Sequence, residues 1–530
     1  MNSHITATKR IWDKSSLLTS TSVYQVITAL LLAISFGLPW CAHAADRKPN
    51  VLFIAVDDLR PELGCYGAKG MLTPNIDRLA ASGVLFERHY VQFAVCIPSR
   101  AALLTSLRSE RTHQIYGPPM WDKVPGVSPI GKTFKAGGYS TVSLGKIWHV
   151  EGGQLTDVFD VKWAPDGGQY ANPGNAALSE KYRKAKVALK KSGQGDAEPG
   201  GPLPPVTECA EVPDNAYADG MIADRAIAEM SRLQGEGNPF LLAVGFHKPH
   251  IPFVAPRKYW ELFDESKLSL APNPEFPRDM PSIAFSGNPN FYNYDYEAFA
   301  PLPQEGRMPD ATARHIIHGY RAAVSFVDAQ VGRVLDELDR LGLTGNTIVV
   351  LWGDHGFHLG DTGMWGKQTN FESATRSPLI ARAPGRTKAG SRSRALVETV
   401  DIFPTLLDLC GLPPLPLSDG RSFLPLLDDP QRPWKEAVCH VFDRHPKVDG
   451  KSQLVIGHGV RSASHRLVSW RAGWELSGKE VAVELYDYDN DPFETRNVAA
   501  DPSYAQTLAK LRQLLQELPA NQPSPAAKAQ

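Results

Sequence analysis

The chain has 530 residues and is almost neutral, with 56 Lys plus Arg against 57 Asp plus Glu, and 42% of its residues are hydrophobic. This composition excludes a largely disordered chain and is typical of a globular protein with a sizeable core. Because there is no basic excess to attract phosphates, we expect no nucleic-acid partner.

The first 44 residues have the pattern of an export signal. Basic residues up to Lys14 precede an apolar run over residues 23–38, and the small residues Ala42 and Ala44 follow it. A membrane anchor is the alternative, but the run is short, polar residues interrupt it, and the small-residue pattern is typical of a cleavage site. We therefore predict a signal peptide over residues 1–44, an exported protein that is periplasmic or secreted, and no membrane span.

The chain has six cysteines, one of which, Cys41, belongs to the predicted leader. An exported domain of this size with so few cysteines is not a disulfide scaffold, and the odd number that remains points to a free thiol. We expect Cys65 and Cys410, in apolar or glycine-rich surroundings, to be small core residues.

Short apolar runs alternate with helical patterns along the first three quarters of the chain. The runs predict buried strands over residues 51–56, 140–144, 240–244 and 347–351. The clearest helical pattern covers residues 311–341, with an apolar stripe at helical spacing and Gly342 at its end. Strands that alternate with helices predict an α/β fold with a mostly parallel sheet.

Two stretches interrupt this pattern. Residues 152–214 are rich in Gly and Pro and contain a basic run over 181–191, which predicts a surface insertion with a solvated helix. Further breaks near residue 430 precede two strand-like runs and a terminal helical pattern. We therefore predict a main domain over residues 45–430 and a smaller α+β subdomain with a tail over residues 431–530.

Polar side chains follow each of the four predicted strands. They are Asp57 and Asp58, Lys146 and His149, His247, and Asp354 and His355. Each of them alone has an ordinary explanation as a turn, a cap or a solvated group. In an open α/β sheet, however, ligands bind outside the carboxyl ends of the strands, so the coincidence predicts one shared site.

The three aspartates at these strand ends predict a cation. Asp57, Asp58 and Asp354 would repel one another in a sheltered site unless a positive ion neutralised them. Carboxylate oxygens are ligands that calcium and magnesium prefer, whereas zinc favours nitrogen and sulfur. We therefore expect a divalent metal with oxygen ligands.

A fifth segment, from Cys96 to Arg100, precedes a helix-forming run over residues 101–107. This places Cys96 just before or within the first helical turn, where free N–H groups and the helix dipole suit an anion. Arg100 adds a guanidinium one turn further along. The alternative for such a cysteine is a small buried hydrophobe.

The sequence Cys-Ile-Pro-Ser-Arg over residues 96–100 resembles the Cys-x-Pro-Ser-Arg signature of type I sulfatases, in which the cysteine is oxidised to formylglycine after synthesis. Further segments are similar to the iduronate-2-sulfatase subgroup of that family, namely residues 56–61, 64–67, 245–253 and 329–333. The resemblance extends from about Lys48 to residues 491–492, essentially the whole chain after the leader.

The resemblance implies an alkaline-phosphatase-like α/β fold, with a mostly parallel sheet sandwiched by helices, a sulfatase catalytic domain over residues 45–430 and a smaller C-terminal subdomain. It implies one bound Ca²⁺, with ligands from Asp57, Asp58, Cys96 as formylglycine, Asp354 and His355. The catalytic residues that it implies are Cys96, Arg100, Lys146, His149, His247 and Lys367.

The resemblance also implies partners and a substrate. The partners are a formylglycine-generating or equivalent maturation enzyme and a sulfated carbohydrate, such as a 2-O-sulfated uronate in a polysaccharide. Two other functions stay open: a phosphodiester or phosphonate hydrolase of the same superfamily, and an inactive carbohydrate-binding homologue.

The sequence departs from the family pattern at three places. Ser106 and Leu107 follow the signature where the family has Gly-Arg, and we expect Arg108 to serve for the displaced arginine. Thr362 stands where the iduronate-2-sulfatase subgroup has a histidine. Cys209 has no neighbouring cysteine for the local disulfide that the resemblance implies.

Overall fold

The computed structural model describes residues 48–119, 121–149, 157–193, 198–287, 289–296, 299–300, 307–448 and 450–517. The predicted signal peptide over residues 1–44 lies outside them. From Lys48 onward the chain forms one compact unit. The domain boundary near residue 430 therefore stays a prediction from the sequence.

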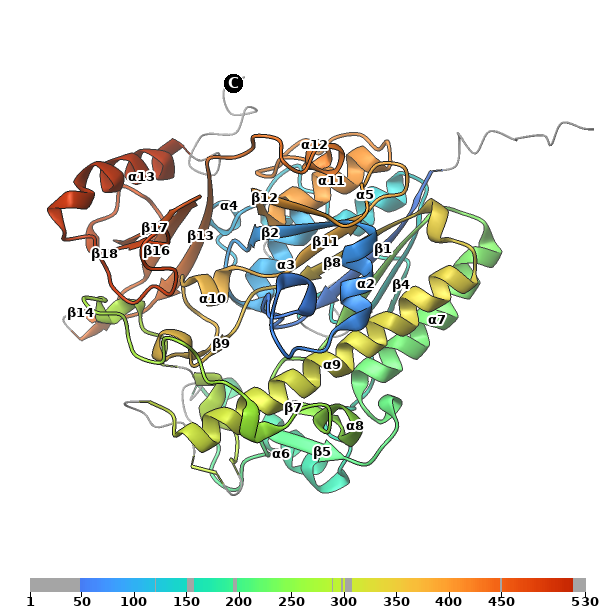
Figure 1. Ribbon diagram of the computed structural model, residues 1–530, viewed down its shortest axis with the longest axis horizontal. Helices are drawn as coiled ribbons and strands as arrows, with labels where there is room; N and C mark the ends of the chain where they lie inside the picture. Colours follow the sequence, from blue (N-terminus) through green and yellow to red (C-terminus); the bar gives the residue numbers. More distant parts are fainter. Residues whose placement is uncertain are drawn as a thin grey trace, which may run out of the picture. The chain divides into compact units, whose positions relative to one another are not determined.

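The main structural element is an eight-stranded sheet with the order β12-β2-β11-β8-β1-β6-β3-β4 (Figure 1). Its strands are β1 (Asn50–Val56), β2 (Val84–Tyr90), β3 (Ser140–Gly145), β4 (Val161–Trp163), β6 (Phe240–Phe246), β8 (Thr347–Gly353), β11 (Leu379–Arg382) and β12 (Ser391–Glu398). Neighbouring strands are parallel except at β11, which is antiparallel to both β2 and β8. The prediction of a mostly parallel sheet is confirmed, and all four predicted strands are present.

Alternate residues of each central strand pack on opposite faces of the sheet. In β1, Leu52, Ile54 and Val56 belong to one apolar cluster, whereas the alternate residues Phe53 and Ala55 belong to the other. Helices α2 (Pro74–Ser82), α7 (Ala218–Glu236) and α9 (Asp310–Arg340) cover the first face, and α3 (Cys96–Thr105), α5 (Ile130–Ala136), α11 (Ile402–Leu409) and α12 (Leu424–Asp428) cover the second. Burial of each large aliphatic side chain contributes about 1.5–3 kcal/mol, so the two clusters stabilise the sandwich.

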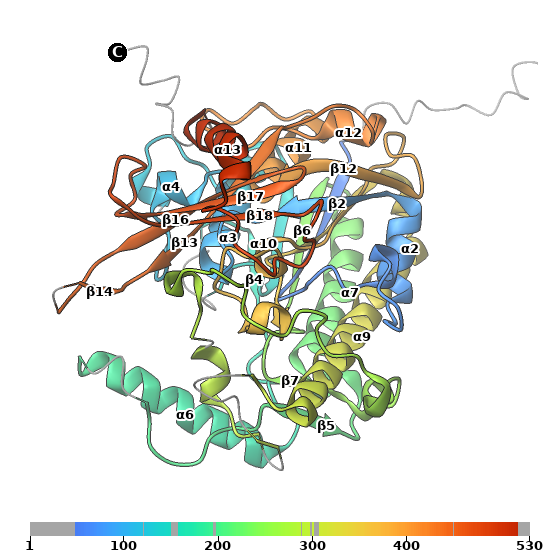
Figure 2. The ribbon, with the colours of Figure 1, turned by 60° about the vertical axis from the view of Figure 1, so that its left-hand side comes forward.

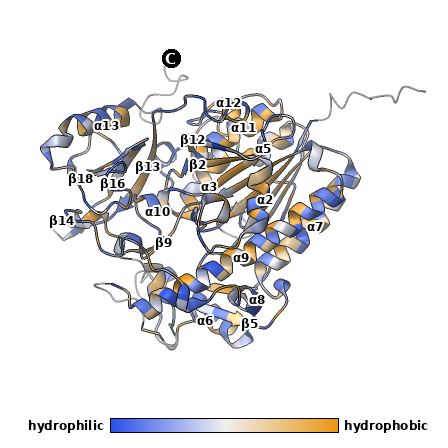
Figure 3. Ribbon diagram, in the orientation of Figure 1, coloured by the Kyte–Doolittle hydropathy of each residue, from blue (hydrophilic) through white to orange (hydrophobic). Residues whose placement is uncertain are grey.

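The longest helix, α9, runs diagonally beside α7 in Figures 1 and 2. Its apolar stripe includes Val324, Val327, Val331 and Val334, all buried, as the helical periodicity predicts. Figure 3 shows the same alternation of hydrophobic and hydrophilic residues along α7 and α9, against the hydrophobic central strands. No helix in the described part of the chain is long and apolar enough to cross a membrane.

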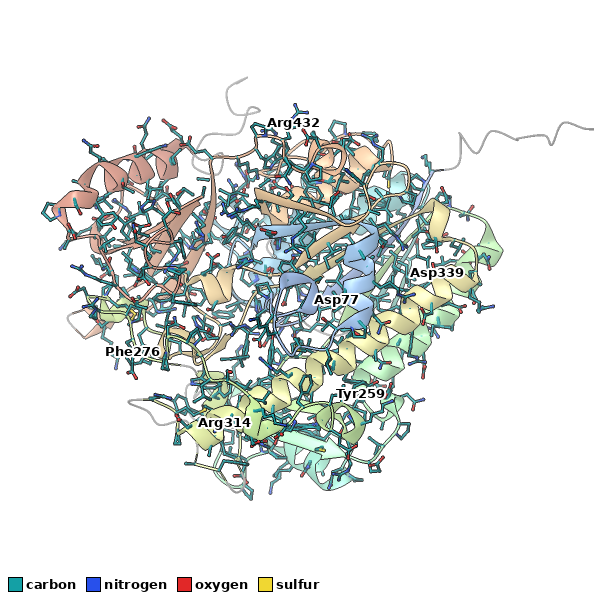
Figure 4. The ribbon with its side chains drawn as sticks, viewed as in Figure 1. Asp77, Tyr259, Phe276, Arg314, Asp339 and Arg432 are labelled. Carbon is teal, nitrogen blue, oxygen red and sulfur yellow. The ribbon has the colours of Figure 1, made fainter. Side chains whose placement is uncertain are left out.

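The inserted stretch carries α6 (Pro173–Lys191), which has no buried residue, as its solvated basic face predicts. Two short strands, β5 (Thr207–Ala210) and β7 (Phe253–Pro256), pair in parallel nearby, and α8 (Arg257–Trp260) follows them. Tyr259 of α8, labelled in Figure 4, packs on Phe326 of α9 with ring centroids 5.3 Å apart.

All five cysteines of the described residues are free. The structure therefore forms no disulfide at Cys209, which is exposed. Cys410 is buried in the core as expected, whereas Cys65 is only partly buried, so that part of the prediction is wrong.

A second, antiparallel sheet has the order β13-β16-β17-β18, and α13 (Ala505–Glu517) packs on it through Leu511 and Leu515. Its strands are β13 (Ala437–Arg444), β16 (Val455–Ser462), β17 (His465–Ala472) and β18 (Glu480–Asp487). The remaining short elements are α4 (Ser109–Thr112), α10 (Glu372–Thr375), β9 (His358–Leu359), β10 (Trp365–Gly366), β14 (Lys447–Val448) and β15 (Lys451–Ser452). An antiparallel sheet with one packed helix is the smaller α+β architecture that the sequence predicts for the C-terminal part of the chain.

Two glycines allow β3 and β6 to approach closely where they end. Gly145 has φ +63°. Gly245 lies so near the turn after β3 that a Cβ added to it would be 2.2 Å from the Lys146 carbonyl oxygen. The contact is with backbone, which cannot move aside as a flexible side chain could. Neither position accepts a larger residue without displacing the turn that carries Lys146.

We expect Gly245→Ala to destabilise the protein by about 2 kcal/mol or more, because it overpacks the backbone between two central strands. Gly235→Ala is the matched control, since this helical glycine has no atom within 4 Å of an added Cβ and alanine favours a helix. Chemical denaturation measures both. Equal free energies of unfolding for the two variants would contradict the close approach.

Candidate active site

The carboxyl ends of four adjacent strands bring the predicted polar residues together. Strands β8, β1, β6 and β3 are neighbours in that order, and Val56 pairs with both Gly353 and Phe246. Main-chain hydrogen bonds continue past the strands, from Asp57 N to Phe246 O at 3.3 Å and from Asp354 N to Val56 O at 3.2 Å. The residues that follow these strands therefore leave the sheet at one edge, as predicted.

A tight turn directs two adjacent carboxylates into this edge. Asp58 has φ +58°, a left-handed conformation that aspartate tolerates better than most residues. Its N–H donates to Asp354 Oδ1 at 3.0 Å, and its carbonyl accepts from the Tyr320 hydroxyl at 2.8 Å. Asp57, Asp58 and Asp354 are all fully buried. The turn therefore lets consecutive aspartates contribute to one cluster.

Cys96 is the first residue of α3, as the sequence predicts, and is 2% exposed. Four polar groups surround its sulfur: Asp57 Oδ1 at 3.3 Å, His355 Nε2 at 3.4 Å, Lys367 Nζ at 3.2 Å and Lys146 Nζ at 3.7 Å. Lys146 follows β3, and Lys367 follows β10. A cysteine that served only as a core hydrophobe would not lie among two ammonium groups and a carboxylate.

Arg100, one turn along α3, binds two of the carboxylates. It is fully buried, and its Nη2 lies 2.9 Å from Asp354 Oδ2 and 3.2 Å from Asp57 Oδ1. Lys146 also pairs with Asp57, and Lys367 pairs with Asp58. Buried charges of this kind are tolerated only when they are paired and hydrogen-bonded, which these are.

The cluster shifts the ionisation of its members. Burial and Asp57 oppose ionisation of the Cys96 thiol, but Lys146, Lys367 and His355 together lower its pKa to about 7. Burial and the Asp57 charge raise the pKa of Asp354 to about 8. A carboxyl group whose pKa is raised by burial and by a neighbouring carboxylate would ionise more readily beside a bound cation.

The donor atoms fit a divalent metal. Asp58 Oδ2 is buried and has no hydrogen-bond partner, so it is available as a ligand. Two groups of side chains within the described residues bring one ligand atom each within 4.8 Å of one another: Asp57, Asp58, Cys96 and His250, and Asp57, Cys96, Asp354 and His355. All five predicted metal ligands belong to these groups. Three of the six side chains in these groups are carboxylates, whose oxygens suit a hard cation.

The two predicted catalytic histidines lie beside this cluster. Desolvation and Lys146 lower the pKa of His247 to about 3, and partial desolvation and Lys146 lower that of the exposed His149 to about 4. Asp57 acts on the pKa of both in the opposite direction. Both rings are therefore neutral at pH 7. Lys146 and Asp57, which act on the pKa of Cys96, also act on the pKa of each histidine.

Two residues of the site were not predicted from the sequence. His250 belongs to a possible ligand group, and Asp219 of α7 accepts the N–H groups of His247 and Lys248 at 2.7 and 2.8 Å. His250 lies in the segment over residues 245–253 that carries the family resemblance, and that was its only signal. Nothing in the sequence around Asp219 indicates its contact with residues 28 positions away.

Arg108, which we expect to serve for the displaced arginine of the family pattern, binds a carboxylate on a distant segment in the folded chain, and its part in conversion of Cys96 stays a prediction. Its Nη2 binds both carboxylate oxygens of Glu398, at 2.7 and 2.6 Å, and its N–H donates to Asp419. It therefore ties the segment after α3 to the end of β12.

Comparison with known proteins identifies the class of this enzyme. The sulfatase family model matches residues 49–412, and a model of the C-terminal part of N-sulphoglucosamine sulphohydrolase matches residues 360–521. The chain belongs to the sulfatase family and is a sulfuric ester hydrolase.

Within that family it resembles iduronate 2-sulfatase. The mouse enzyme is 33% identical and the human enzyme 32% identical, and each alignment covers 89% of this chain and 94% of the relative. A phosphonate monoester hydrolase from Silicibacter pomeroyi has the same fold, with a TM-score of 0.68, 25% identity, and coverage of 90% of this chain and 96% of that one.

We expect a divalent cation to stabilise the chelator-treated protein, because binding to the folded state alone adds about 2.7 kcal/mol at 100 times the dissociation constant. Asp58→Asn should greatly reduce this gain in melting temperature, since asparagine tolerates the left-handed backbone but loses the charge. Asp428→Asn, in an exposed pair with Arg386, is the control. Equal metal-dependent shifts in both variants would remove Asp58 from the site.

Proposed function

We propose that this sulfatase is an exported enzyme that releases sulfate from a sugar, such as a 2-O-sulfated uronate in a polysaccharide, and that it uses formylglycine at position 96 and one Ca²⁺. The observation that carries the proposal is Cys96 at the start of α3, in contact with Lys146, Lys367 and Asp57. Similarity to iduronate 2-sulfatase supports the choice of sugar. A formylglycine-generating or equivalent enzyme would have to act on Cys96 before or during folding, because the folded chain buries it.

The modification explains why a cysteine occupies this position. A hydrated aldehyde supplies one hydroxyl whose oxygen attacks sulfur, and a second hydroxyl whose deprotonation re-forms the aldehyde and breaks the bond between carbon and the sulfate oxygen, whereas a thiol offers no such exit. Asp57, Asp58, Asp354 and His355, with residue 96 after its conversion, would hold the Ca²⁺. That ion supplies positive charge at the sulfate oxygens and at the nucleophile.

The side chains around residue 96 have separate roles in the proposal. Lys146, Lys367 and Arg100 neutralise negative charge that develops on the sulfate oxygens. Arg100 also holds Asp57 and Asp354 in position through its hydrogen bonds. Because these groups are buried and already oriented, little reorganisation is needed during the reaction.

The two histidines would transfer protons at different atoms. We assign His247 to protonate the leaving sugar oxygen and His149 to remove the proton from the second hydroxyl of residue 96. The negative charge of a bound sulfate ester raises the pKa of a neighbouring imidazole, so His247 can take up its proton with the substrate. Asp219 holds the main chain of His247 in place.

A phosphodiester or phosphonate hydrolase is the second candidate, because the phosphonate monoester hydrolase from Silicibacter pomeroyi shares the fold. An inactive sugar-binding homologue is disfavoured, because every proposed nucleophile, acid, base and metal ligand is present in this chain.

We expect the active protein to hydrolyse an aryl sulfate faster than an aryl phosphodiester and to carry an aldehyde at residue 96. Cys96→Ala should abolish turnover without unfolding the protein, since a small residue replaces a small one at a helix start. Peptide mass spectrometry identifies the modification, and Cys410→Ala controls for loss of a buried thiol. A fully active enzyme with an unmodified thiol, or one that prefers the phosphodiester, would refute the proposal.

We expect His247→Ala to slow a sugar sulfate more than an aryl sulfate, by about 10²–10⁴-fold, because an alkoxide needs a proton to leave and a phenolate hardly does. His149→Ala should slow both substrates alike, because its proton transfer follows loss of the alcohol. Rates of sulfate release with each ester measure this, with His465→Ala in the second sheet as control. If His247→Ala slows sulfate release from both esters equally, His247 is not the group that protonates the leaving sugar oxygen.

A further inference from the structure

Arg444, the last residue of β13, reaches the active site from the C-terminal sheet. Its Nη2 donates to Gln368 O at 2.8 Å, and Gln368 N donates to Ala94 O at 3.2 Å. Gln368 directly follows Lys367, whose Nζ lies 3.2 Å from Cys96 Sγ. The guanidinium therefore contacts the segment that carries one of the two lysines at the nucleophile.

The positive charge of Arg444 has no carboxylate partner within ion-pair distance in the described part of the chain. Other arginines of the interior do, as Arg461 pairs with Glu372 and Arg466 with Glu494. Arg444 instead donates to main-chain carbonyls and lies over the Phe442 ring, 4.6 Å from its centroid. Burial lowers the pKa of Arg444 to about 10, so the group is still a cation at neutral pH.

The guanidinium retains some capacity for a ligand. Of its five N–H donors, Nε bonds to Ile283 O, Nη1 to Asp443 O, and Nη2 to Gln368 O and more distantly to Ala284 O. One N–H on Nη1 is left over among these contacts. A cation that has no carboxylate partner and a spare donor is available to bind an anionic ligand beside the site.

Two further side chains complete a binding surface next to Arg444. Asp443 is 6% exposed, and its Oδ1 is buried without a hydrogen-bond partner, while Oδ2 bonds to His445. Tyr116 is 55% exposed. Desolvation raises the pKa of Tyr116 to about 12, and the charges of Asp443, Arg444, Lys367 and Cys96 act on that pKa as well, so the hydroxyl lies within electrostatic reach of the active site.

We infer that Arg444, Asp443 and Tyr116 form a recognition site for an acidic sugar. Arg444 binds an anionic group of the sugar, which we assign as the uronate carboxylate, Asp443 Oδ1 accepts a hydroxyl, and Tyr116 packs against the ring. This inference rests on the proposed function, since it names the substrate class of the same active site. It makes the C-terminal sheet responsible for substrate choice and the main sheet for the chemistry.

The test compares two substrates that differ only at the carboxyl group. These are a 2-O-sulfated uronoside and its carboxyl-reduced analogue, which keeps the ring and the sulfate ester. For the unaltered enzyme kcat/KM should favour the uronoside, and Arg444→Gln should reduce that preference by about 10- to 100-fold, the usual effect of losing a hydrogen bond to a charged group. Arg421→Gln is the matched control, because its guanidinium lies over the Trp434 ring at 4.1 Å and is exposed.

Three outcomes would overturn the inference. If Arg444→Gln lowers kcat equally on both substrates, Arg444 only holds Gln368 and Lys367 in place. If Arg444→Gln lowers kcat/KM for a neutral sugar that carries a second sulfate but not for the uronoside, Arg444 binds a sulfate group and the carboxylate assignment is wrong. If the unaltered enzyme releases sulfate but does not distinguish the two substrates, no carboxylate is recognised.

A second variant protects the test against misfolding of Arg444→Gln. Tyr116 is exposed, so Tyr116→Ala should fold normally and raise KM for sugar sulfates several-fold more than for a small aryl sulfate. Equal KM changes on both would remove Tyr116 from the site. If the unaltered enzyme hydrolyses no sulfate ester at all, the proposed function itself is wrong. This outcome is distinct from failure of the recognition site, in which sulfate is released without a preference for the uronoside.

Discussion

Charge balance in a buried cluster is the constraint on which the rest of this structure depends. Asp57, Asp58 and Asp354 are removed from water, and Arg100, Lys146 and Lys367 accompany them. Ionised groups in such a setting are stable only with close partners of opposite charge. Two of these groups, Lys146 and Lys367, also lower the pKa of Cys96, and one oxygen of Asp58 is left for a metal, so stability and chemistry arise from the same contacts.

The architecture explains how so many charges reach one point. Parallel neighbours β8, β1, β6 and β3 end at the same edge, and each delivers its polar residues in the first positions after the strand. Helix α3 brings the cysteine with its N-terminal N–H groups, which favour negative charge. The second sheet closes on the segment before Cys96 through Val441 N to Gln92 O at 2.8 Å and the contact between Phe93 and Phe442. It is therefore part of the site's surroundings and not a separate appendage.

Much of the fold and of the candidate site was predictable, because the relevant signals are local. The continuous apolar run of β1 reflects a strand that is buried on both faces, and the apolar stripe of α9 at a period of 3.6 reflects a helix with one face on the core. Arg108 shows where this reasoning fails. Its role is decided by Glu398, which lies 290 positions away, and no local pattern indicates that pairing. Asp219 was missed for the same reason, since it acts on His247 only after α7 has packed against β6.

The sequence by itself determined four strands of the main sheet, the place of Cys96 near the start of α3 and the family signature, because apolar runs, strand ends and short motifs are properties of neighbouring residues. Only the tertiary structure decided which lysine meets which aspartate, that His250 joins the cluster, and that Arg444 contacts Gln368, the residue after Lys367. These are contacts between segments far apart in the chain, and they depend on how the two sheets and their helices pack.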